Sequence, residues 1–124
     1  MSSKPIKITH ADFSGLLLKK KFDNKVVLLK FYVDWCGYCK RTIPLFNNLA
    51  NHYKNDSKVE IAEYDCDDED NKEYINEYIN KFNYGYKVQG YPTIVLYKNG
   101  VFVGQYNGER SENAMIKVLN ELKK

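Results

Sequence analysis

Five runs of apolar residues along the chain have the length and spacing of β-strands. Strands are predicted at residues 6–8, 26–33, 59–64, 93–97 and 101–106. The run at 26–33 is almost continuously apolar, which is typical of a central strand covered on both faces. The last two runs flank Lys98-Asn99-Gly100, a strong hairpin signal because Asn and Gly tolerate the backbone of a tight turn. We therefore expect the sheet to end in an antiparallel hairpin.

Four further segments show the spacing of amphipathic helices. They begin near Asp12, near Cys36, at residue 67 (ending near 82) and after the capping residue Ser111. The predicted order is β-α-β-α-β-α-β-β-α. Alternating elements followed by a terminal hairpin indicate an α/β protein, with a central mixed five-stranded sheet and four helices on both of its faces. The 124 residues suit a single domain spanning 1–124.

The net charge and the sequences of the two termini limit the classes of partner and the cellular compartment that we expect. The net charge is +3 with both signs spread along the chain, so neither nucleic acid nor a membrane is expected as a partner. No run reaches transmembrane length. Without a secretory signal or an ER-retention signal, the sequence predicts a cytoplasmic monomer. The alternatives are the virion of a large DNA virus, since the composition is typical of an AT-rich genome, and the ER lumen if the chain is a trimmed piece.

The chemistry is expected in Cys36-Gly37-Tyr38-Cys39, which follows the strand at 26–33 and opens a helix. A strand that delivers Cys-x-x-Cys to a helix N-terminus is typical of a dithiol/disulfide redox site. The helix dipole favours the thiolate of Cys36, and Cys39 lies one turn on along the same face. We expect Cys36 to be the nucleophile and Cys39 the resolving thiol, with no cofactor beyond this redox-active disulfide.

The third cysteine, Cys66, follows the strand at 59–64. With no second Cys-x-x-Cys and no paired histidines, no metal site is expected. Inert burial is the expectation for Cys66. A regulatory thiol and an intermolecular disulfide are the alternatives.

Motifs along nearly the whole chain are similar to those of one family. Phe31-Tyr32-x-x-Trp35-Cys36-Gly37-x-Cys39-Lys40 resembles its active-site block, and Gly90-Tyr91-Pro92-Thr93 resembles its cis-proline loop. Tyr106-x-Gly108-x-Arg110 is more like its isomerase branch. The sequence thus resembles the thioredoxin superfamily, most of all a catalytic (a-type) domain of protein disulfide isomerase. The resemblance implies the thioredoxin fold and a protein disulfide oxidoreductase/isomerase activity.

The resemblance also implies which residues meet the substrate. Trp35, Gly37 and Tyr38 border the nucleophile, while Tyr91 and Pro92 form the loop that offers its backbone to an extended substrate. Isomerases usually carry His at the position of Tyr38, and thioredoxins carry Pro. Tyrosine lacks the charge with which His favours a thiolate, so we expect a reduction potential between those of the strong oxidases and the strong reductants.

Two charged positions depart from the family pattern. Lys30 stands where the family has a buried acid, and Glu63 stands where the neighbouring strand usually has lysine. We expect a swapped buried pair in which Glu63 exchanges the proton of Cys39. The alternative is that Lys30 extends to solvent and Glu63 is solvated. Arg110 matches an isomerase arginine that lowers the pKa of the second cysteine, and a plain surface arginine is its alternative.

The sequence therefore predicts a thiol-disulfide oxidoreductase that reduces, oxidises or isomerises protein disulfides. Its expected partners are protein thiols and disulfides, with glutathione or a thioredoxin-reductase-type protein as candidate electron donors. A glutathione-dependent, glutaredoxin-like activity is the nearest alternative, because Tyr38 is similar to the glutaredoxin pattern. A redox-competent chaperone or binding module is the alternative from another class.

Overall fold

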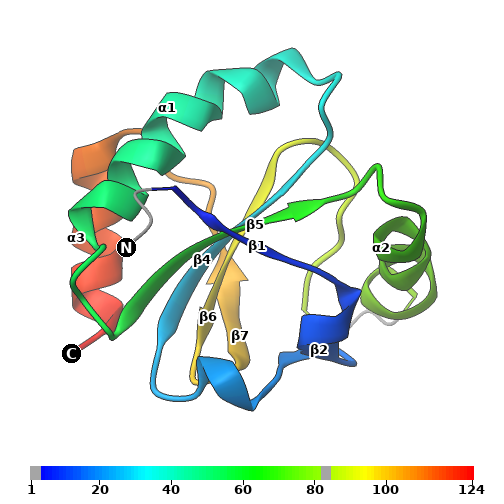
Figure 1. Ribbon diagram of the computed structural model, residues 1–124, viewed down its shortest axis with the longest axis horizontal. Helices are drawn as coiled ribbons and strands as arrows, with labels where there is room; N and C mark the ends of the chain where they lie inside the picture. The colour runs from blue at the N-terminus through cyan, green and yellow to red at the C-terminus, as the bar shows by residue number, and fades with distance from the viewer. Residues whose placement is uncertain (1–3, 82–84) are drawn as a thin grey trace.

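Five strands form the central sheet in the computed structural model, which describes residues 4–81 and 85–124. They are β1 (Ile6–Ile8), β4 (Val26–Tyr32), β5 (Val59–Asp65), β6 (Thr93–Lys98) and β7 (Val101–Gln105). Their order in the sheet is β1-β5-β4-β6-β7. Strands β1, β5 and β4 are parallel, whereas β6 and β7 run antiparallel to their neighbours. The predicted mixed sheet with a terminal hairpin is confirmed, and β4 is its central strand (Figure 1).

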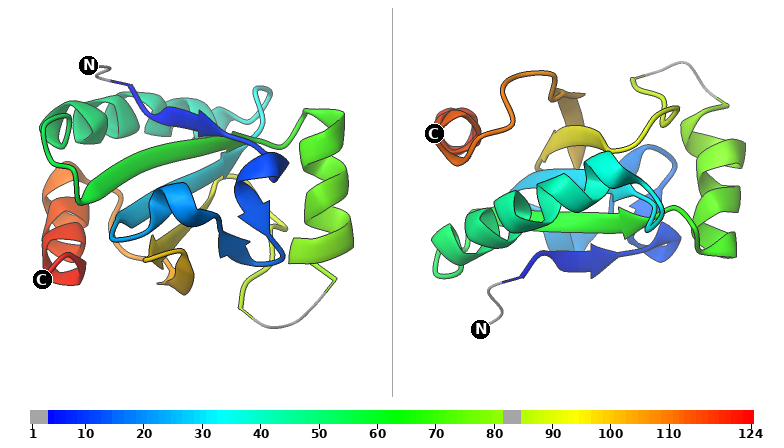
Figure 2. Two further views of the ribbon diagram at one scale, coloured as in Figure 1. Left: turned by 60° about the horizontal axis from the view of Figure 1, so that its bottom comes forward. Right: turned by 90° about the horizontal axis from the view of Figure 1, so that it is seen from above.

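Helices cover both faces of this sheet. Helices α1 (Gly37–His52) and α3 (Glu112–Leu122) pack on one face, and α2 (Glu69–Tyr74) lies on the other (Figure 2). Because side chains of a strand alternate between faces, Leu28 of β4 joins the core under α1 and α3, and Leu29 joins the core beside α2. No helix in the described part of the chain is long and apolar enough to cross a membrane.

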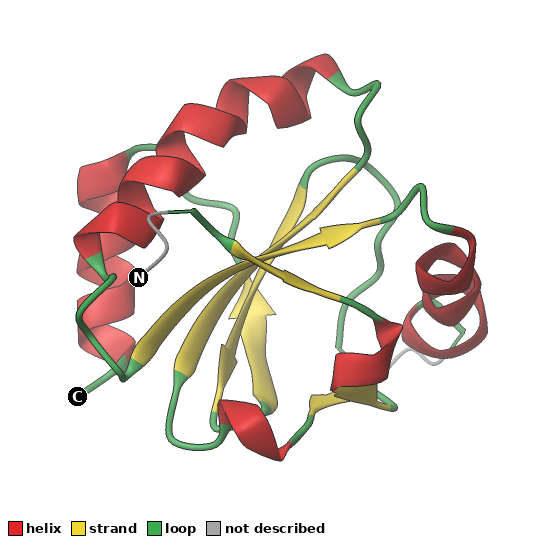
Figure 3. Cartoon of the chain, in the orientation of Figure 1, coloured by secondary structure: helices red, strands yellow, loops and turns green. Residues whose placement is uncertain are grey.

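The helix predicted to begin near Asp12 is wrong. In its place lie the 3-10 turns η1 (His10–Asp12) and η2 (Lys20–Phe22) around a two-stranded hairpin of β2 (Phe13–Ser14) and β3 (Leu17–Leu18) (Figure 3). Thr9 and Asp12 cap each other across a single turn, and Gly15 reverses the chain with a φ of 62°. The Leu18 N–H then donates to the Gly100 carbonyl at 2.9 Å, which ties the hairpin to the β6–β7 turn. The described residues therefore contain three α-helices rather than four.

The helix predicted over residues 67–82 is present in a modified form. It begins after the cap Asp68, runs through α2 and continues as a π-helical turn, η3 (Ile75–Ile79), with Asn80 as its C-cap. The predicted end of this helix, near residue 82, lies outside the described residues. The wider π turn rotates the residues that follow Ile75 about the helix axis, relative to their positions in a regular α-helix. This rotation sets the direction of the Asn80 side chain.

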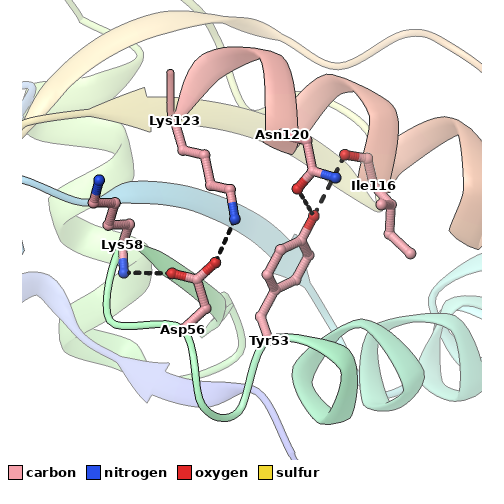
Figure 4. A network of polar contacts seen from close by, with 6 residues as sticks. All are labelled: Tyr53, Asp56, Lys58, Ile116, Asn120 and Lys123. Carbon is pink, nitrogen blue, oxygen red and sulfur yellow. Dashed lines mark hydrogen bonds and ion pairs between the residues drawn. The ribbon is translucent and has the colours of Figure 1, made fainter.

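Polar contacts fasten α3 to the end of α1. The Tyr53 hydroxyl lies 2.9 Å from Asn120 Oδ1 and 3.4 Å from the Ile116 carbonyl oxygen (Figure 4). Lys123 Nζ donates to Asp56 Oδ2 at 2.6 Å, and this contact holds the pKa of the Asp56 carboxyl below its usual value. These contacts fix the C-terminal end of the helix whose N-terminal end carries the cysteines.

Candidate active site

Strand β4 leads the chain directly to Cys36, which is the N-cap residue of α1. The first turns of a helix leave backbone N–H groups without intrahelical partners, and a side chain at the N-cap accepts from them. Here the Cys36 sulfur takes this role and accepts a hydrogen bond from the Cys39 N–H at 3.2 Å. The 16-residue helix α1 adds the positive end of its dipole at the same point. The site therefore favours a negative charge on Cys36.

The two cysteines have opposite protonation tendencies. Burial opposes ionisation of Cys36, but hydrogen bonds from the Cys39 thiol and from the Cys39 and Tyr38 N–H groups outweigh it, so the pKa of Cys36 is lowered. Burial and the hydrogen bond to Cys36 raise the pKa of Cys39 to about 11. Both side chains are free thiols in this structure. Cys36 is thus prepared to attack, whereas Cys39 must first lose a proton.

This difference predicts a stepwise reaction with iodoacetamide as the pH rises. Only the thiolate is nucleophilic, so Cys36 should be alkylated below pH 9, while Cys39, with a pKa of about 11, and Cys66, with a pKa of about 12, should react only in strongly alkaline solution. Mass spectrometry of peptides from the folded, reduced protein measures this order. Alkylation of Cys66 ahead of Cys36 would contradict the structure.

The loop before β6 closes the site from the other side. The peptide bond between Tyr91 and Pro92 is cis, and the Tyr91 carbonyl oxygen accepts a hydrogen bond from the Cys36 thiol at 3.4 Å. The Thr93 hydroxyl donates to the Gly90 carbonyl at 2.6 Å and holds the turn. The structure therefore brings Tyr91 and Pro92 to the nucleophile.

Two exposed aromatic side chains flank the cysteines. Trp35 is 72% exposed and Tyr38 is 64% exposed. The Trp35 indole N–H donates to Asp67 Oδ1 at 3.2 Å, and its ring meets the Tyr91 ring edge-on with centroids 6.2 Å apart. Sequence reasoning missed Asp67, because nothing in the pattern links positions 32 residues apart. The side chain of Trp35 is thus held in place although it is open to solvent.

Lys30 and Glu63 are direct neighbours on the paired strands β4 and β5. Lys30 is only 2% exposed, and its Nζ lies 3.9 Å from Glu63 Oε2. The Lys30 ammonium donates to the Thr42 hydroxyl at 3.2 Å, and Thr42 donates to the Cys39 carbonyl at 2.6 Å. Burial lowers the pKa of Lys30, while the charge of Glu63 acts against that decrease. The structure therefore places this pair next to Cys39, with Lys30 directed inward.

Thr42 is a contact that the sequence analysis did not anticipate. It stands three residues after Cys39, on the helix face that the cysteine pair defines, and this spacing was the available signal. A cavity of about 620 Å³ connects the region to the surface, and its lining includes Lys30, Glu63 and Cys39. The Lys30 and Glu63 side chains thus lie in the same cavity as Cys39, together with apolar residues such as Val33 and Ile43.

Arg110 lies on the exposed loop between β7 and α3. Its charge contributes to the lowered pKa of Cys36. Its role toward Cys39 stays a prediction.

Replacing Arg110 by alanine should slow reoxidation of the dithiol by glutathione disulfide. Loss of the cation destabilises a nearby thiolate, and for an exposed charge the effect is about twofold to fivefold at low salt. Lys117→Ala, which removes an exposed cation from α3, is the control. Stopped-flow Trp35 fluorescence measures the rate, and equal rates for Arg110→Ala and the control would remove the role.

Cys66 is buried next to the site. It is 3% exposed, and its N–H donates to the Tyr32 carbonyl at 2.9 Å. Burial, with the charge of Asp65 adding to it, raises the pKa of the Cys66 thiol to about 12. A thiol in this environment is a weak nucleophile at neutral pH.

The sheet order, the Cys-x-x-Cys at the start of α1 and the cis-proline loop facing it together define a thioredoxin-fold dithiol site. The Thioredoxin family model matches residues 4–121, and the chain belongs to the thioredoxin family. The fold predicted from the sequence is thus confirmed.

Several curated proteins to which the chain is similar are named protein disulfide isomerases. Protein disulfide-isomerase 1 of Dictyostelium discoideum is 38% identical over 98 residues, which are 78% of this chain and 25% of that protein. Protein disulfide isomerase-like 2-2 of Oryza sativa is 36% identical over 100 residues, which are 80% of this chain and 24% of that protein. The chain spans about a quarter of the length of these relatives.

Solved structures agree on the fold. Human ERp44 form II superposes with a TM-score of 0.73 at 24% identity, covering 100% of this chain and 31% of that chain. Thioredoxin f from spinach chloroplast gives a TM-score of 0.71 at 22% identity, covering 99% of this chain and 96% of that chain.

Proposed function

We propose that this domain is a thiol-disulfide oxidoreductase acting on protein disulfides through Cys36 and Cys39. The observation that carries the proposal is the Cys36 sulfur, which caps α1, accepts the Cys39 N–H at 3.2 Å and faces the Tyr91 carbonyl. A nucleophile of lowered pKa beside a backbone acceptor suits attack on a disulfide in an extended chain.

The reaction proceeds in two exchanges. The Cys36 thiolate attacks one sulfur of the substrate disulfide, forms a mixed disulfide and releases the other substrate sulfur, which takes up a proton. Cys39 then loses its proton and attacks the Cys36 sulfur, and the second substrate sulfur leaves as a thiolate. Two electrons have passed to the substrate, and Cys36 and Cys39 are joined. Run backwards, the same steps oxidise a substrate dithiol, and no cofactor takes part.

The surroundings of the cysteines supply the remaining roles. Trp35, Gly37 and Tyr38 form the contact surface around the nucleophile, and Tyr91 and Pro92 receive the substrate backbone. The support for this assignment is the exposure of the two aromatic rings and the approach of the Tyr91 carbonyl to Cys36.

Proton exchange with Cys39 falls to the Lys30–Glu63 pair. The thiol has a pKa of about 11 and needs an acceptor before it can attack. Glu63 lies at 3.9 Å from Lys30 and lines the same cavity as Cys39, so water can carry the proton to its carboxylate.

Tyr38→His should make the protein more oxidising. A histidine between the cysteines stabilises the Cys36 thiolate and hence the reduced form, and a tenfold change in the equilibrium constant corresponds to about 30 mV. A glutathione titration measures the shift. An unchanged or more reducing potential would show that Tyr38 does not set the potential.

Reduction of insulin and refolding of reduced, denatured ribonuclease test the proposed function. Turnover with dithiothreitol as the only electron source supports it, and turnover that requires glutathione supports the glutaredoxin-like alternative. Binding of unfolded chains without turnover would identify a binding module, for which the exposed Trp35 and Tyr38 would be the surface. The proposed partners are protein thiols and disulfides, and the proposed electron source is glutathione or a thioredoxin-reductase-type protein. We further propose that the protein acts as a monomer in the cytoplasm.

A further inference from the structure

Another hollow lies along the cis-proline loop, and it shares no lining residue with the Lys30 cavity. It has a volume of about 400 Å³. Its lining is Lys87, Gln89, Gly90, Tyr91, Pro92, Thr93 and Gln105. Three of these residues carry long polar side chains, and within the described lining Lys87 is the one with a charge. We call this hollow the loop groove.

The segment before the cis-proline has two distinct faces. Tyr86 and Val88 are buried at 5% and 4% exposure, whereas Lys87 and Gln89 are exposed. This alternation is that of an extended chain with one face on the core and the other toward solvent. Lys87 and Gln89 therefore reach the loop groove from one side, and Gln105 reaches it from β7.

One side chain holds this segment in its extended form. Asn80 Oδ1 accepts the Val88 N–H at 2.7 Å, and Asn80 Nδ2 donates to the Val88 carbonyl at 2.9 Å. Both backbone groups of one residue are thus bound by one amide, much as a neighbouring strand would bind them. Asn80 faces Val88 because the π turn ends there, where its own N–H donates to the Ile75 carbonyl at 2.7 Å.

We propose that the loop groove is a specificity subsite for an acidic side chain of an extended peptide substrate, with Lys87 as the recognising residue and Asn80 as the positioning residue. The inference rests on the proposed function, since the peptide must reach the groove from a disulfide held at Cys36. Lys87 attracts a carboxylate, and the amides of Gln89 and Gln105 donate to it or to the peptide backbone. Val88 lies three residues before Tyr91. The hydrogen bonds of Asn80 to the Val88 backbone therefore also hold in place the segment from Val88 to Tyr91, along which the substrate peptide would bind.

The first test uses two disulfide-linked peptides that are identical except for the residues flanking the cysteine, which are Glu in one and Lys in the other. The wild-type protein should reduce the Glu peptide about fivefold more efficiently in kcat/KM at low salt, and this preference should shrink with added salt. Lys87→Glu should reverse the order. Lys117→Glu, an equal charge change on α3, should keep the wild-type preference.

The outcomes distinguish a failure of the proposed subsite from a failure of the proposed oxidoreductase function. If the wild-type protein reduces neither peptide, the proposed function fails. If it reduces both with equal efficiency and Lys87→Glu changes nothing, the function stands and the subsite is overturned.

The second test separates positioning from general stability. Asn80→Ala should raise KM for both peptides about fivefold to tenfold, through loss of two hydrogen bonds that order the edge, and should leave kcat nearly unchanged. Asn80→Asp, which can still accept the Val88 N–H, should fall between. Reduction of a small aromatic disulfide and the reduction potential should stay at wild-type values. Asn113→Ala on α3 is the matched amide control, and an unchanged KM in Asn80→Ala would overturn the positioning role.

Discussion

Cys36→Ser is expected to abolish reduction of protein disulfides, whereas Cys39→Ser should stop the reaction halfway. A serine hydroxyl stays protonated at neutral pH and does not attack sulfur, so turnover should fall by at least about 1,000-fold. In Cys39→Ser the nucleophile and its helix N-terminus are intact, because the backbone N–H of residue 39 still donates to the Cys36 sulfur and the serine hydroxyl can donate in place of the Cys39 thiol. The mixed disulfide should therefore form and persist.

Mass spectrometry and non-reducing gels measure the trapped species with a disulfide-bonded protein as bait. Cys66→Ser is the control, since Cys66 is buried with a pKa of about 12, and it should keep wild-type activity. Trapping by Cys36→Ser in place of Cys39→Ser would assign the two cysteines the other way round.

Glu63→Ala is expected to slow resolution of the mixed disulfide far more than its formation. Cys36 is already prepared to ionise, so attack does not need Glu63, while Cys39 needs an acceptor for its proton. General base catalysis of this kind contributes about 100-fold or more, and the lifetime of the mixed disulfide should lengthen accordingly. Rapid quenching with acid at successive times measures both steps.

The same two strands supply a control for this change. Glu60 also lies on β5, and its Oε1 is 3.4 Å from Lys25 Nζ. Glu60→Ala therefore removes a lysine-paired carboxylate from the same strand, and it should leave the rate of mixed-disulfide resolution unchanged. The double variant Lys30→Glu/Glu63→Lys exchanges the two charges and should resolve faster than Glu63→Ala. If Glu63→Ala and Glu60→Ala resolve at the same rate, Glu63 has no part in proton transfer.

Much of the fold could be predicted because local and global preferences agree along most of the chain. The almost unbroken apolar run of β4 required a central strand, and Asn99-Gly100 required the hairpin, where Asn99 has a φ of 54° and Gly100 a φ of 77°. The helix predicted after Asp12 was wrong because the apolar positions Phe13, Leu16 and Leu17 are also compatible with a short β-hairpin. The contact of Leu18 with Gly100, 82 positions apart, decided between the two, and no local pattern contains it.

The site divides in the same way. The cysteine pair and the loop at Pro92 are local motifs. The pairing of Lys30 with Glu63 could be inferred only through the resemblance to the family pattern, and the two residues are partners in the observed strand register. The contacts of Trp35 with Asp67 and of Asn80 with Val88 could not be inferred. The first depends on the path of the loop after β5, and the second depends on a π turn that shifts the helix register by one residue.

Equilibration of the protein with mixtures of reduced and oxidised glutathione tests whether Cys36 and Cys39 form the redox pair. We expect a single two-electron transition confined to these two residues, with a potential between about −270 mV, as in thioredoxin, and about −120 mV, as in a strong bacterial disulfide oxidase. Alkylation and mass spectrometry at each glutathione ratio would identify the paired residues. Failure of Cys36 and Cys39 to form a disulfide at any ratio, or pairing of either one with Cys66, would contradict this expectation.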